Sequence, residues 1–183
     1  METSLLIAGF GGQGVMLAGQ ILGHAAAYAG KYATYYPSYG PEQRGGTANC
    51  TVIISGEEIG SPVVNQADAV IVMNEPSLGR FEPEVKPGGV ILVNSSLVKR
   101  EARREDIRAV YIPASEIAEK LGSAKSANMV MVGAFIAVTR ALDPEEVERT
   151  IGEKLTGKPG FLEVNKRAFF AGLDEAHRLL AVN

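Results

Sequence analysis

The sequence has very little cysteine, and this excludes several classes of site. Cys50 is the only cysteine among 183 residues, so the chain cannot form an internal disulfide bond. One thiolate is also too few to hold a structural zinc ion or an iron–sulfur cluster. Any metal centre with which the chain works must therefore lie on another polypeptide, and we predict no metal-binding residue here.

A dominant charge sign and a long apolar segment are also missing. The 18 basic and 21 acidic residues are interspersed and give a net charge of −3, so we expect no nucleic-acid or anionic-lipid partner. No segment approaches the roughly 20 apolar residues that cross a bilayer. The N-terminal METSLLIAGFGG lacks the basic residues that open a signal peptide. We therefore expect a cytoplasmic protein that is not bound to a membrane.

Strand and helix patterns alternate along the chain. Short apolar runs ending in glycine are typical of strands buried on both faces, and apolar residues at helical spacing indicate helices. The predicted strands are Ser4–Ala8, Tyr32–Tyr36, Thr47–Ser55, Ala67–Met73, Gly89–Val93 and Val110–Pro113. The predicted helices are Gly14–Ala29, Ser77–Val85, Ser115–Leu121, Ala127–Leu142, one that begins at Asp143, and Phe161–Leu180. Ser115 and Asp143 are expected to be N-caps.

One segment departs from this alternation and indicates an antiparallel hairpin. After the strand that ends at Ser55, a Ser-Gly-Glu-Glu turn leads back through Ile59 to Val64. Further on, the Pro87-Gly88-Gly89 sequence predicts a turn. We therefore predict an α/β fold, organised as a single three-layer α/β/α domain over residues 1–183. Its Rossmann-like sheet is mostly parallel and contains an antiparallel hairpin.

A glycine-rich loop, GFGGQG, follows the first predicted strand and opens the first predicted helix. Gly9, Gly11 and Gly14 match the pattern G-x-G-x-x-G. In this setting the glycines permit a tight turn, and the free N–H groups of Gly11, Gly12, Gln13 and Gly14 can attract a phosphate. The alternative is a tight strand-to-helix turn that binds no ligand.

An acidic residue at the end of the second strand is missing, which disfavours a nicotinamide cofactor. A dinucleotide site normally has an Asp or Glu there to hold the ribose hydroxyl. Residues 33–37 read ATYYP, without an acid or an arginine. We therefore infer that the glycine loop binds phosphate without being a standard NAD site.

A second glycine-containing loop, SYGPEQRGGTANC, places an arginine beside two glycines. The Arg44 guanidinium can grip a phosphate through two parallel hydrogen bonds, and Gly45 and Gly46 would let a ligand approach the main chain. We predict that this loop and the first one form a single anion-binding site, in which we include Glu42. The alternative is that Arg44 forms an ion pair with Glu42 or contacts a neighbouring subunit.

With these features placed, the chain resembles the gamma subunit of the 2-oxoacid:ferredoxin oxidoreductases, which corresponds to an internal domain of single-chain pyruvate:ferredoxin oxidoreductase. The resemblance covers nearly the whole chain. Within the family, GPEQRGGTA is most similar to the version in 2-oxoglutarate or 2-ketoisovalerate enzymes. The stretches that carry the resemblance are GFGGQGVMLAGQIL (Gly9–Leu22), YYPSYGPEQRGGTANCTV (Tyr35–Val52) and SANMVMVGAF (Ser126–Phe135).

The resemblance implies a part of an enzyme complex. Such complexes hold thiamine diphosphate and Mg²⁺ between alpha and beta subunits, pass electrons through 4Fe–4S clusters to ferredoxin or a ferredoxin-like subunit, and deliver the acyl group to coenzyme A. The gamma-type domain borders the active site and helps to hold coenzyme A, so we expect no catalytic residue on this chain. The phosphates of coenzyme A suit the two glycine loops, and Asn128, near the start of an apolar helix, is expected to donate to the same ligand. The alternative is that Asn128 only caps this helix.

Three other hypotheses are consistent with the sequence. The most closely related one is that the chain is the corresponding subunit of an indolepyruvate oxidoreductase. A second is a free-standing nucleotide-binding dehydrogenase or reductase, and a third is an assembly module whose glycine loops are only structural. When isolated, the chain could form a homodimer. Cys50 is expected in the core, and His24 and His177 are expected to have structural or solvent-facing roles.

Overall fold

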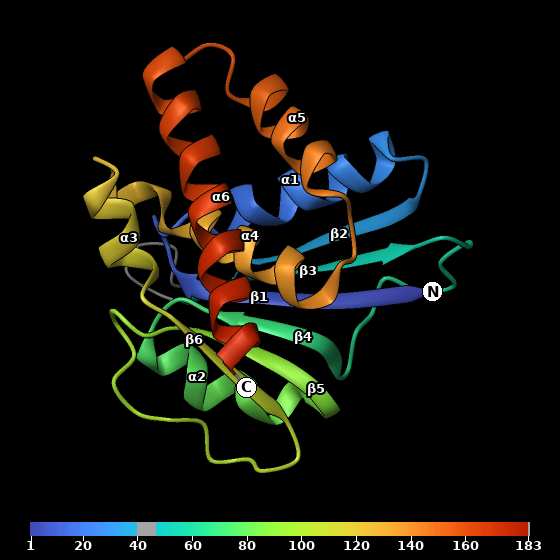
Figure 1. Ribbon diagram of the computed structural model, residues 1–183. Coiled ribbons are helices and arrows are strands. Elements are labelled where there is room, and N and C mark those ends of the chain that lie inside the picture. The colour runs from blue at the N-terminus through green and yellow to red at the C-terminus, as the bar shows by residue number, and fades with distance from the viewer. Residues whose placement is uncertain (40–46, 183) are drawn as a thin grey trace.

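A mixed sheet in the order β2-β3-β1-β4-β5-β6 forms the centre of the molecule in the computed structural model, which describes residues 1–39 and 47–182 (Figure 1). The strands are β1 (Glu2–Phe10), β2 (Tyr32–Tyr39), β3 (Thr47–Ser55), β4 (Ala67–Val72), β5 (Val85–Asn94) and β6 (Arg108–Ile112). Strands β1, β4, β5 and β6 are parallel, whereas β3 is antiparallel to both β1 and β2. The predicted α/β fold with a mixed, mostly parallel sheet is confirmed.

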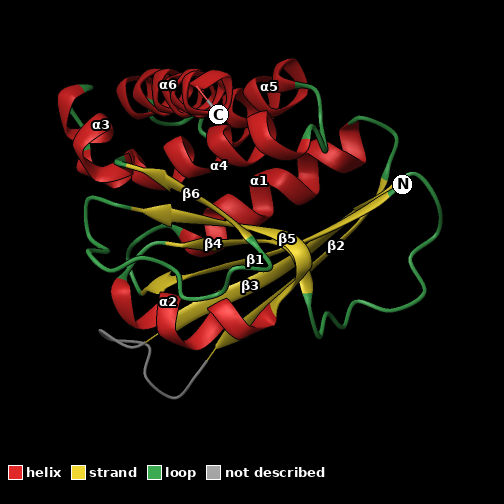
Figure 2. Cartoon of the chain, turned by 60° about the horizontal axis from the view of Figure 1, so that its bottom comes forward, coloured by secondary structure: helices red, strands yellow, loops and turns green. Residues whose placement is uncertain are grey.

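Helices cover both faces of this sheet. They are α1 (Val15–Tyr28), α2 (Glu75–Phe81), α3 (Ala114–Lys120), α4 (Ala127–Thr139), α5 (Pro144–Lys154) and α6 (Pro159–Val182), with short 3-10 turns η1 (Glu82–Glu84) and η2 (Ala124–Ser126). Helix α2 lies alone on one face, and the other helices lie on the opposite face (Figure 2). On that crowded face α1 and α4 contact the strands, while α5 packs on α1 and α6 packs on α4.

The central strands are apolar along consecutive residues because both of their faces are buried. In β1, Leu5 and Ile7 belong to the large core under α1 and α4, whereas Leu6 and Ala8 belong to the smaller core under α2. Each of these four side chains is at most 3% exposed. Alternate residues of a strand point to opposite faces, so one apolar run supplies both cores.

Helix α4 is apolar all round because protein surrounds it. The sheet lies on one side of it and α6 on the other, and residues such as Val132 and Phe135 are fully buried. The two helices cross where Gly133 of α4 faces Gly172 of α6. A Cβ on Gly133 would lie 1.9 Å from the Phe169 carbonyl oxygen, so this close approach requires glycine.

The predicted return strand from Ile59 to Val64 is wrong. Residues 56–66 form a loop, and Val63 is 69% exposed. The physical reason is that β3 already pairs along both edges, with β1 on one side and β2 on the other. A returning strand would have no free edge, so the antiparallel part of the sheet arises from β3 itself.

Several predicted boundaries also shift. Ser115 does not cap α3, whose N-cap is Pro113; its hydroxyl instead accepts a hydrogen bond from Asn94 Nδ2 at 3.0 Å. Asp143 is the N-cap residue of α5, but its side chain makes no capping bond. The predicted turn at residues 87–89 lies inside β5, where the chain bulges against β4. No helix in the described ranges combines the length and the apolar character needed to cross a membrane.

Candidate functional site

The glycine loop lies beside the point where two neighbouring parallel strands lead to helices on opposite faces of the sheet. Strands β1 and β4 are parallel neighbours. Helix α1, which follows β1, contributes to the large core, whereas α2, which follows β4, contributes to the small core on the other face. In open α/β sheets, ligands bind outside the carboxyl ends of the strands at such a switch point. The fold therefore places the GFGGQG loop at the position where a ligand is expected.

Gly11 and Gly12 are exposed at the tip of this loop. Gly12 has φ +91°, and a Cβ built on it would meet no heavy atom within 4 Å. Within the part of the chain that the structure describes, no backbone acceptor takes the N–H of Gly11 or Gly12. The first turn of α1 also carries no acidic residue, so the positive end of the helix dipole is not offset locally. These features suit an anionic ligand.

Gln13 holds the loop together from within. Its backbone N–H donates to Phe10 O at 3.2 Å, and its side-chain Oε1 accepts from Phe10 N at 2.7 Å. Oε1 also accepts from Asn74 Nδ2 at 3.1 Å, while Nε2 donates to Met73 O at 3.4 Å. Because these polar groups are engaged inside the protein, Gln13 fixes the loop's shape, and Gly11 and Gly12 remain the better donors for a ligand.

Asn74 supports the glycine loop, and the sequence analysis did not single it out. It is 3% exposed and lies two residues beyond the carboxyl end of β4. Its Oδ1 accepts from Ser77 N at 3.0 Å and so caps α2, while its Nδ2 reaches Gln13. Asn before Glu75-Pro76 is a recognisable helix-start signal, which would have placed the beginning of α2 correctly. The bond to Gln13 had no signal in the sequence because it spans 61 positions.

Asn128 lies against the loop, but the amide nitrogen that was predicted to donate to a ligand donates to the protein instead. It lies in the first turn of α4 and is 4% exposed, and its Nδ2 donates to Gly14 O at 3.0 Å. A Cβ on Gly14, which has φ +74°, would lie 2.2 Å from this nitrogen. The structure thus brings Gly14 and Asn128 together, with Asn128 supporting the loop from beneath.

The predicted residues Glu42, Arg44, Gly45 and Gly46 lie outside the described residues. The described residues on either side of them can be placed. In the sheet, Thr47 pairs with Phe10 and Ala48 pairs with Gly9, and Tyr39 pairs with Ala48. The described residues Tyr39 and Thr47 therefore lie at the end of the sheet where the glycine loop begins.

Cys50 lies in the core, as expected from its apolar surroundings. It is 0% exposed, and its thiol donates to Val15 O at 3.5 Å. Burial raises the pKa of the Cys50 thiol to about 12, although a hydrogen bond involving the Gly19 backbone offsets part of that rise. Because the thiolate is the reactive form, this cysteine is unsuited to nucleophilic chemistry at neutral pH.

Comparison with known protein families places the chain. Residues 4–175 match the family described as pyruvate ferredoxin/flavodoxin oxidoreductase. The chain belongs to this family. Among curated relatives, ketoisovalerate oxidoreductase subunit VorA of Methanothermobacter marburgensis is 40% identical over 180 residues, which are 98% of this chain and 37% of VorA. The chain thus spans little more than a third of that relative.

A second relative has about the same length as this chain. The 2-oxoglutarate synthase subunit KorC of Methanocaldococcus jannaschii is 37% identical over 182 residues, covering 98% of this chain and 96% of KorC. By name, VorA is a subunit of a ketoisovalerate oxidoreductase and KorC is a subunit of a 2-oxoglutarate synthase. The resemblance inferred from the three sequence stretches is confirmed.

Solved structures give the same result for the fold. The gamma subunit of a keto/oxoacid ferredoxin oxidoreductase from Geobacter sulfurreducens superposes with a TM-score of 0.85 at 32% identity, covering 96% of this chain and 99% of that one. The 2-oxoglutarate:ferredoxin oxidoreductase from Magnetococcus marinus, solved with 2-oxoglutarate, coenzyme A and succinyl-CoA bound, gives a TM-score of 0.87 at 25% identity. It covers 97% of this chain and 31% of that one.

Proposed function

We propose that this chain is the gamma-type subunit of a thiamine-diphosphate-dependent 2-oxoacid:ferredoxin oxidoreductase. The complex would convert a 2-oxoacid and coenzyme A to an acyl-CoA and carbon dioxide while reducing ferredoxin. Family membership and the KorC relative of nearly equal length support this assignment. The partners would be alpha and beta subunits that hold thiamine diphosphate, together with a ferredoxin-like subunit or ferredoxin.

The N–H groups of Gly11 and Gly12, which no backbone acceptor takes among residues 1–39 and 47–182, are the observation that carries this chain's role. Coenzyme A brings a diphosphate and a 3′-phosphate, and such groups bind well to backbone donors at a helix start. The loop offers these donors, has no side chain at Gly12, and lies at the switch point of the sheet. The same region of fold occurs in the Magnetococcus enzyme that was solved with coenzyme A.

The chain's own residues would position the thiol substrate. Gln13, Asn74 and Asn128 fix the loop from three directions, so the bound phosphates would be held in one place. Arg44, Gly45 and Gly46 of the second loop would complete the grip, with Glu42 beside them. Thiamine diphosphate on the partner subunits supplies the decarboxylation chemistry. This chain would accelerate acyl transfer through proximity and orientation.

Two relatives point to two possible 2-oxoacids. KorC is named for 2-oxoglutarate and VorA for ketoisovalerate. We propose 2-oxoglutarate as the substrate, because KorC matches this chain over almost its entire length whereas VorA is a much longer chain. The branched-chain 2-oxoacid is the second candidate.

An affinity-tagged copy of this chain in its native cells provides the test. The purified complex should reduce ferredoxin only when both coenzyme A and a 2-oxoacid are present, and 2-oxoglutarate should give a higher kcat/KM than 3-methyl-2-oxobutanoate or indolepyruvate. Recovery of the chain without thiamine-binding partners, together with tight NAD(P)H binding by the chain alone, would contradict the proposal and favour a free-standing reductase.

The second loop is tested separately in the same complex. Arg44→Ala should raise the KM for coenzyme A about tenfold, because a charge-assisted pair with a phosphate is lost, and the subunits should stay together in gel filtration. A complex that falls apart with an unchanged KM would assign Arg44 to subunit contact instead.

A further inference from the structure

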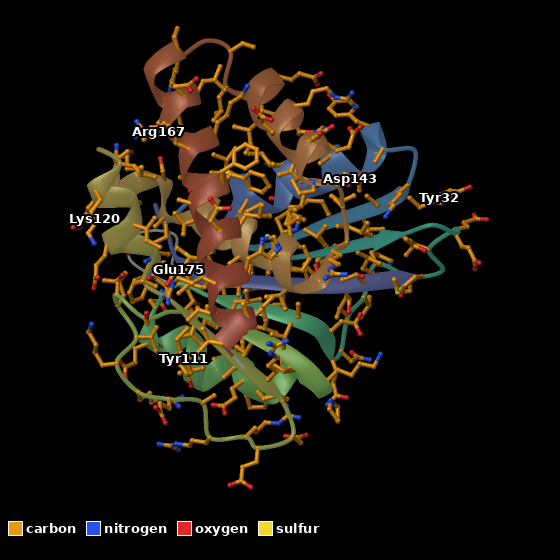
Figure 3. All side chains as sticks on the ribbon, in the orientation of Figure 1. Tyr32, Tyr111, Lys120, Asp143, Arg167 and Glu175 are labelled. Carbon is orange, nitrogen blue, oxygen red and sulfur yellow. The ribbon has the colours of Figure 1, made fainter. Side chains whose placement is uncertain are left out.

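A cavity of about 360 Å³ lies at the end of α1 opposite to the glycine loop. It is formed where four segments meet: the start of β2, the end of α4, the start of α5 and the second half of α6. Its volume falls in the range of small-molecule sites. Figure 3 shows Asp143, at the start of α5, and Tyr32, at the start of β2, toward the side of the molecule where β1 begins. The glycine loop lies at the other end of β1.

Two cationic side chains line this cavity. Lys31 belongs to the turn after α1, and its Nζ donates to Ala141 O at 2.8 Å, which holds the ammonium group near the cavity. Arg140 follows α4. Neither side chain forms an ion pair with a carboxylate among residues 1–39 and 47–182. An anion could therefore bind both groups without displacing an existing partner.

Arg140 has a backbone conformation that glycine normally adopts. Its φ is 54° and its ψ 30°, and it is the single non-glycine residue with positive φ in the described ranges. This left-handed position after a helix is usually glycine, because an L side chain there costs conformational energy. Gly30 and Gly122, which lie two residues beyond the ends of α1 and α3, also have positive φ. A charged side chain kept at a strained position is an indication of function.

The other residues that line the cavity indicate the chemical character of the rest of the ligand. Leu142 and Ile136 are 4% and 2% exposed, and Leu173 is partly buried against the same core. Asp143 also lines the cavity and makes no capping bond to α5, and His177 lines it from α6. The cavity therefore combines apolar side chains with two positively charged residues, Lys31 and Arg140, and one acidic residue, Asp143.

We propose that this cavity binds a small organic anion with a compact apolar body. Its carboxylate or phosphate oxygens would lie between Lys31 and Arg140, and its apolar part would contact Leu142 and Leu173. The cavity shares no residue with the glycine loop, and α1 separates the two by about 20 Å, at 1.5 Å per residue. The inference therefore does not depend on the proposed coenzyme A role.

Binding is tested with the full-length chain, ¹⁵N-labelled and observed by NMR. Three probes are titrated at constant ionic strength: 3-methylbutanoate, inorganic phosphate and the neutral alcohol 3-methylbutan-1-ol. Either anion should shift the amide signals of Lys31, Arg140 and their neighbours. The alcohol has the apolar body without the charge and should bind about tenfold more weakly than 3-methylbutanoate. Tighter binding of phosphate than of the carboxylate would identify the ligand as a phosphate ester.

Arg140→Gly separates a binding role from a structural one. Glycine suits the left-handed conformation, so the variant should melt at a higher temperature than the natural chain and yet bind the preferred anion about tenfold more weakly. Lys31→Gln, which keeps a donor for Ala141 O, should also weaken binding. Arg178→Gln is the control, because Arg178 lies next to His177 on α6 but pairs with Glu175; it should bind normally.

Three results would overturn the proposal. One is the absence of localised shifts around the cavity with both anions. Another is equal binding of the alcohol and 3-methylbutanoate. The third is an Arg140→Gly variant that is stabilised but retains full anion affinity, which would leave Arg140 without a binding role.

Discussion

At the crossing of α4 and α6, a Cβ on Gly172 would lie 1.8 Å from the Val130 carbonyl oxygen, whereas a Cβ on Gly12 would have no heavy atom within 4 Å. The first glycine is required by the protein's own packing. The second has a left-handed backbone beside open space, which a ligand can fill. Surroundings, rather than residue type, thus separate a packing glycine from a binding glycine in this fold.

The same comparison explains how firmly each region is built. The α4–α6 crossing is held by backbone contact between two helices. The glycine loop is held by side chains, because Gln13 spans it, Asn74 supports it from the N-cap of α2 and Asn128 supports it from α4. A loop that presents its N–H groups outward has few internal backbone bonds of its own, so its order must come from such neighbouring polar side chains.

The largest expected effect is at the helix crossing. Gly172→Val should destabilise the chain by about 3 kcal/mol or more, because a side chain cannot fit against the α4 backbone. Thermal unfolding followed by circular dichroism measures this loss. The matched control is Gly23→Ala within α1, where a Cβ would meet Tyr35 Cβ at an ordinary 3.8 Å.

Gly23→Ala should instead stabilise the chain by about 0.5–1 kcal/mol, as alanine does in an unobstructed helix interior. Equal melting temperatures for Gly172→Val and the natural chain would show that α4 and α6 do not approach as closely as the structure indicates. In that case Gly172 would not be an example of a glycine required by packing.

A smaller effect is expected where α1 packs on β3. A Cβ on Gly19 would lie 2.6 Å from Cys50 Sγ and 2.9 Å from Tyr35 Cε2, so Gly19→Ala should cost about 2 kcal/mol. Both contacts are with side chains, which can be shortened by substitution. Adding Cys50→Ala should recover about 1 kcal/mol, measured as a double-mutant cycle by urea unfolding. Strict additivity of the two changes would mean that Cys50 is not the obstacle.

The regular elements of the fold could be predicted from the sequence because their signals are local. The buried runs of β1 and β4, and the all-round apolar pattern of α4, predicted both position and burial. Asn128 was singled out as a polar residue at the start of an otherwise apolar helix, and it does lie against the glycine loop, but the bond from its Nδ2 to Gly14 O was not foreseen. These predictions required only neighbouring residues and the periodicity of their apolar positions.

The rest could not be predicted, because it depends on pairings between distant segments. The strand predicted from Ile59 to Val64 does not form, because β3 already pairs with another strand along both of its edges. Only the full sheet order shows this. The prediction also ended β2 at Tyr36. The strand continues past Pro37 because β2 is the edge strand of the sheet, where a missing N–H is tolerated.

The next largest effect on stability is expected at Asn74, which supports the glycine loop. Asn74→Asp keeps an acceptor for Ser77 N, so the cap of α2 should survive. It removes the donor to Gln13 Oε1 and places a carboxylate against that oxygen. We expect a loss of about 1–2 kcal/mol in stability and a raised KM for coenzyme A in the assembled complex.

The control is Asn74→Ser, whose hydroxyl also caps α2 but brings no charge to Gln13. It should be milder than Asn74→Asp in both measurements. If Asn74→Asp matched the natural chain in its KM for coenzyme A, Gln13 would not need Asn74 to fix the loop, and the side-chain support described above would be confined to Asn128.

The substitutions with the smallest expected effect on stability distinguish a glycine needed for ligand binding from one needed only for its backbone conformation. Gly12→Ala and Gly30→Ala each place a methyl group at positive φ, +91° and +75°, with no heavy atom within 4 Å. Each should cost about 1 kcal/mol of stability. They lie at opposite ends of α1, and only Gly12 belongs to the proposed ligand site. Gly12→Ala alone should therefore raise the KM for coenzyme A, by about tenfold, because its methyl group would keep a phosphate from the loop's N–H groups. Equal KM values for the two variants would show that open space beside a left-handed glycine is not sufficient to mark a binding site in this fold.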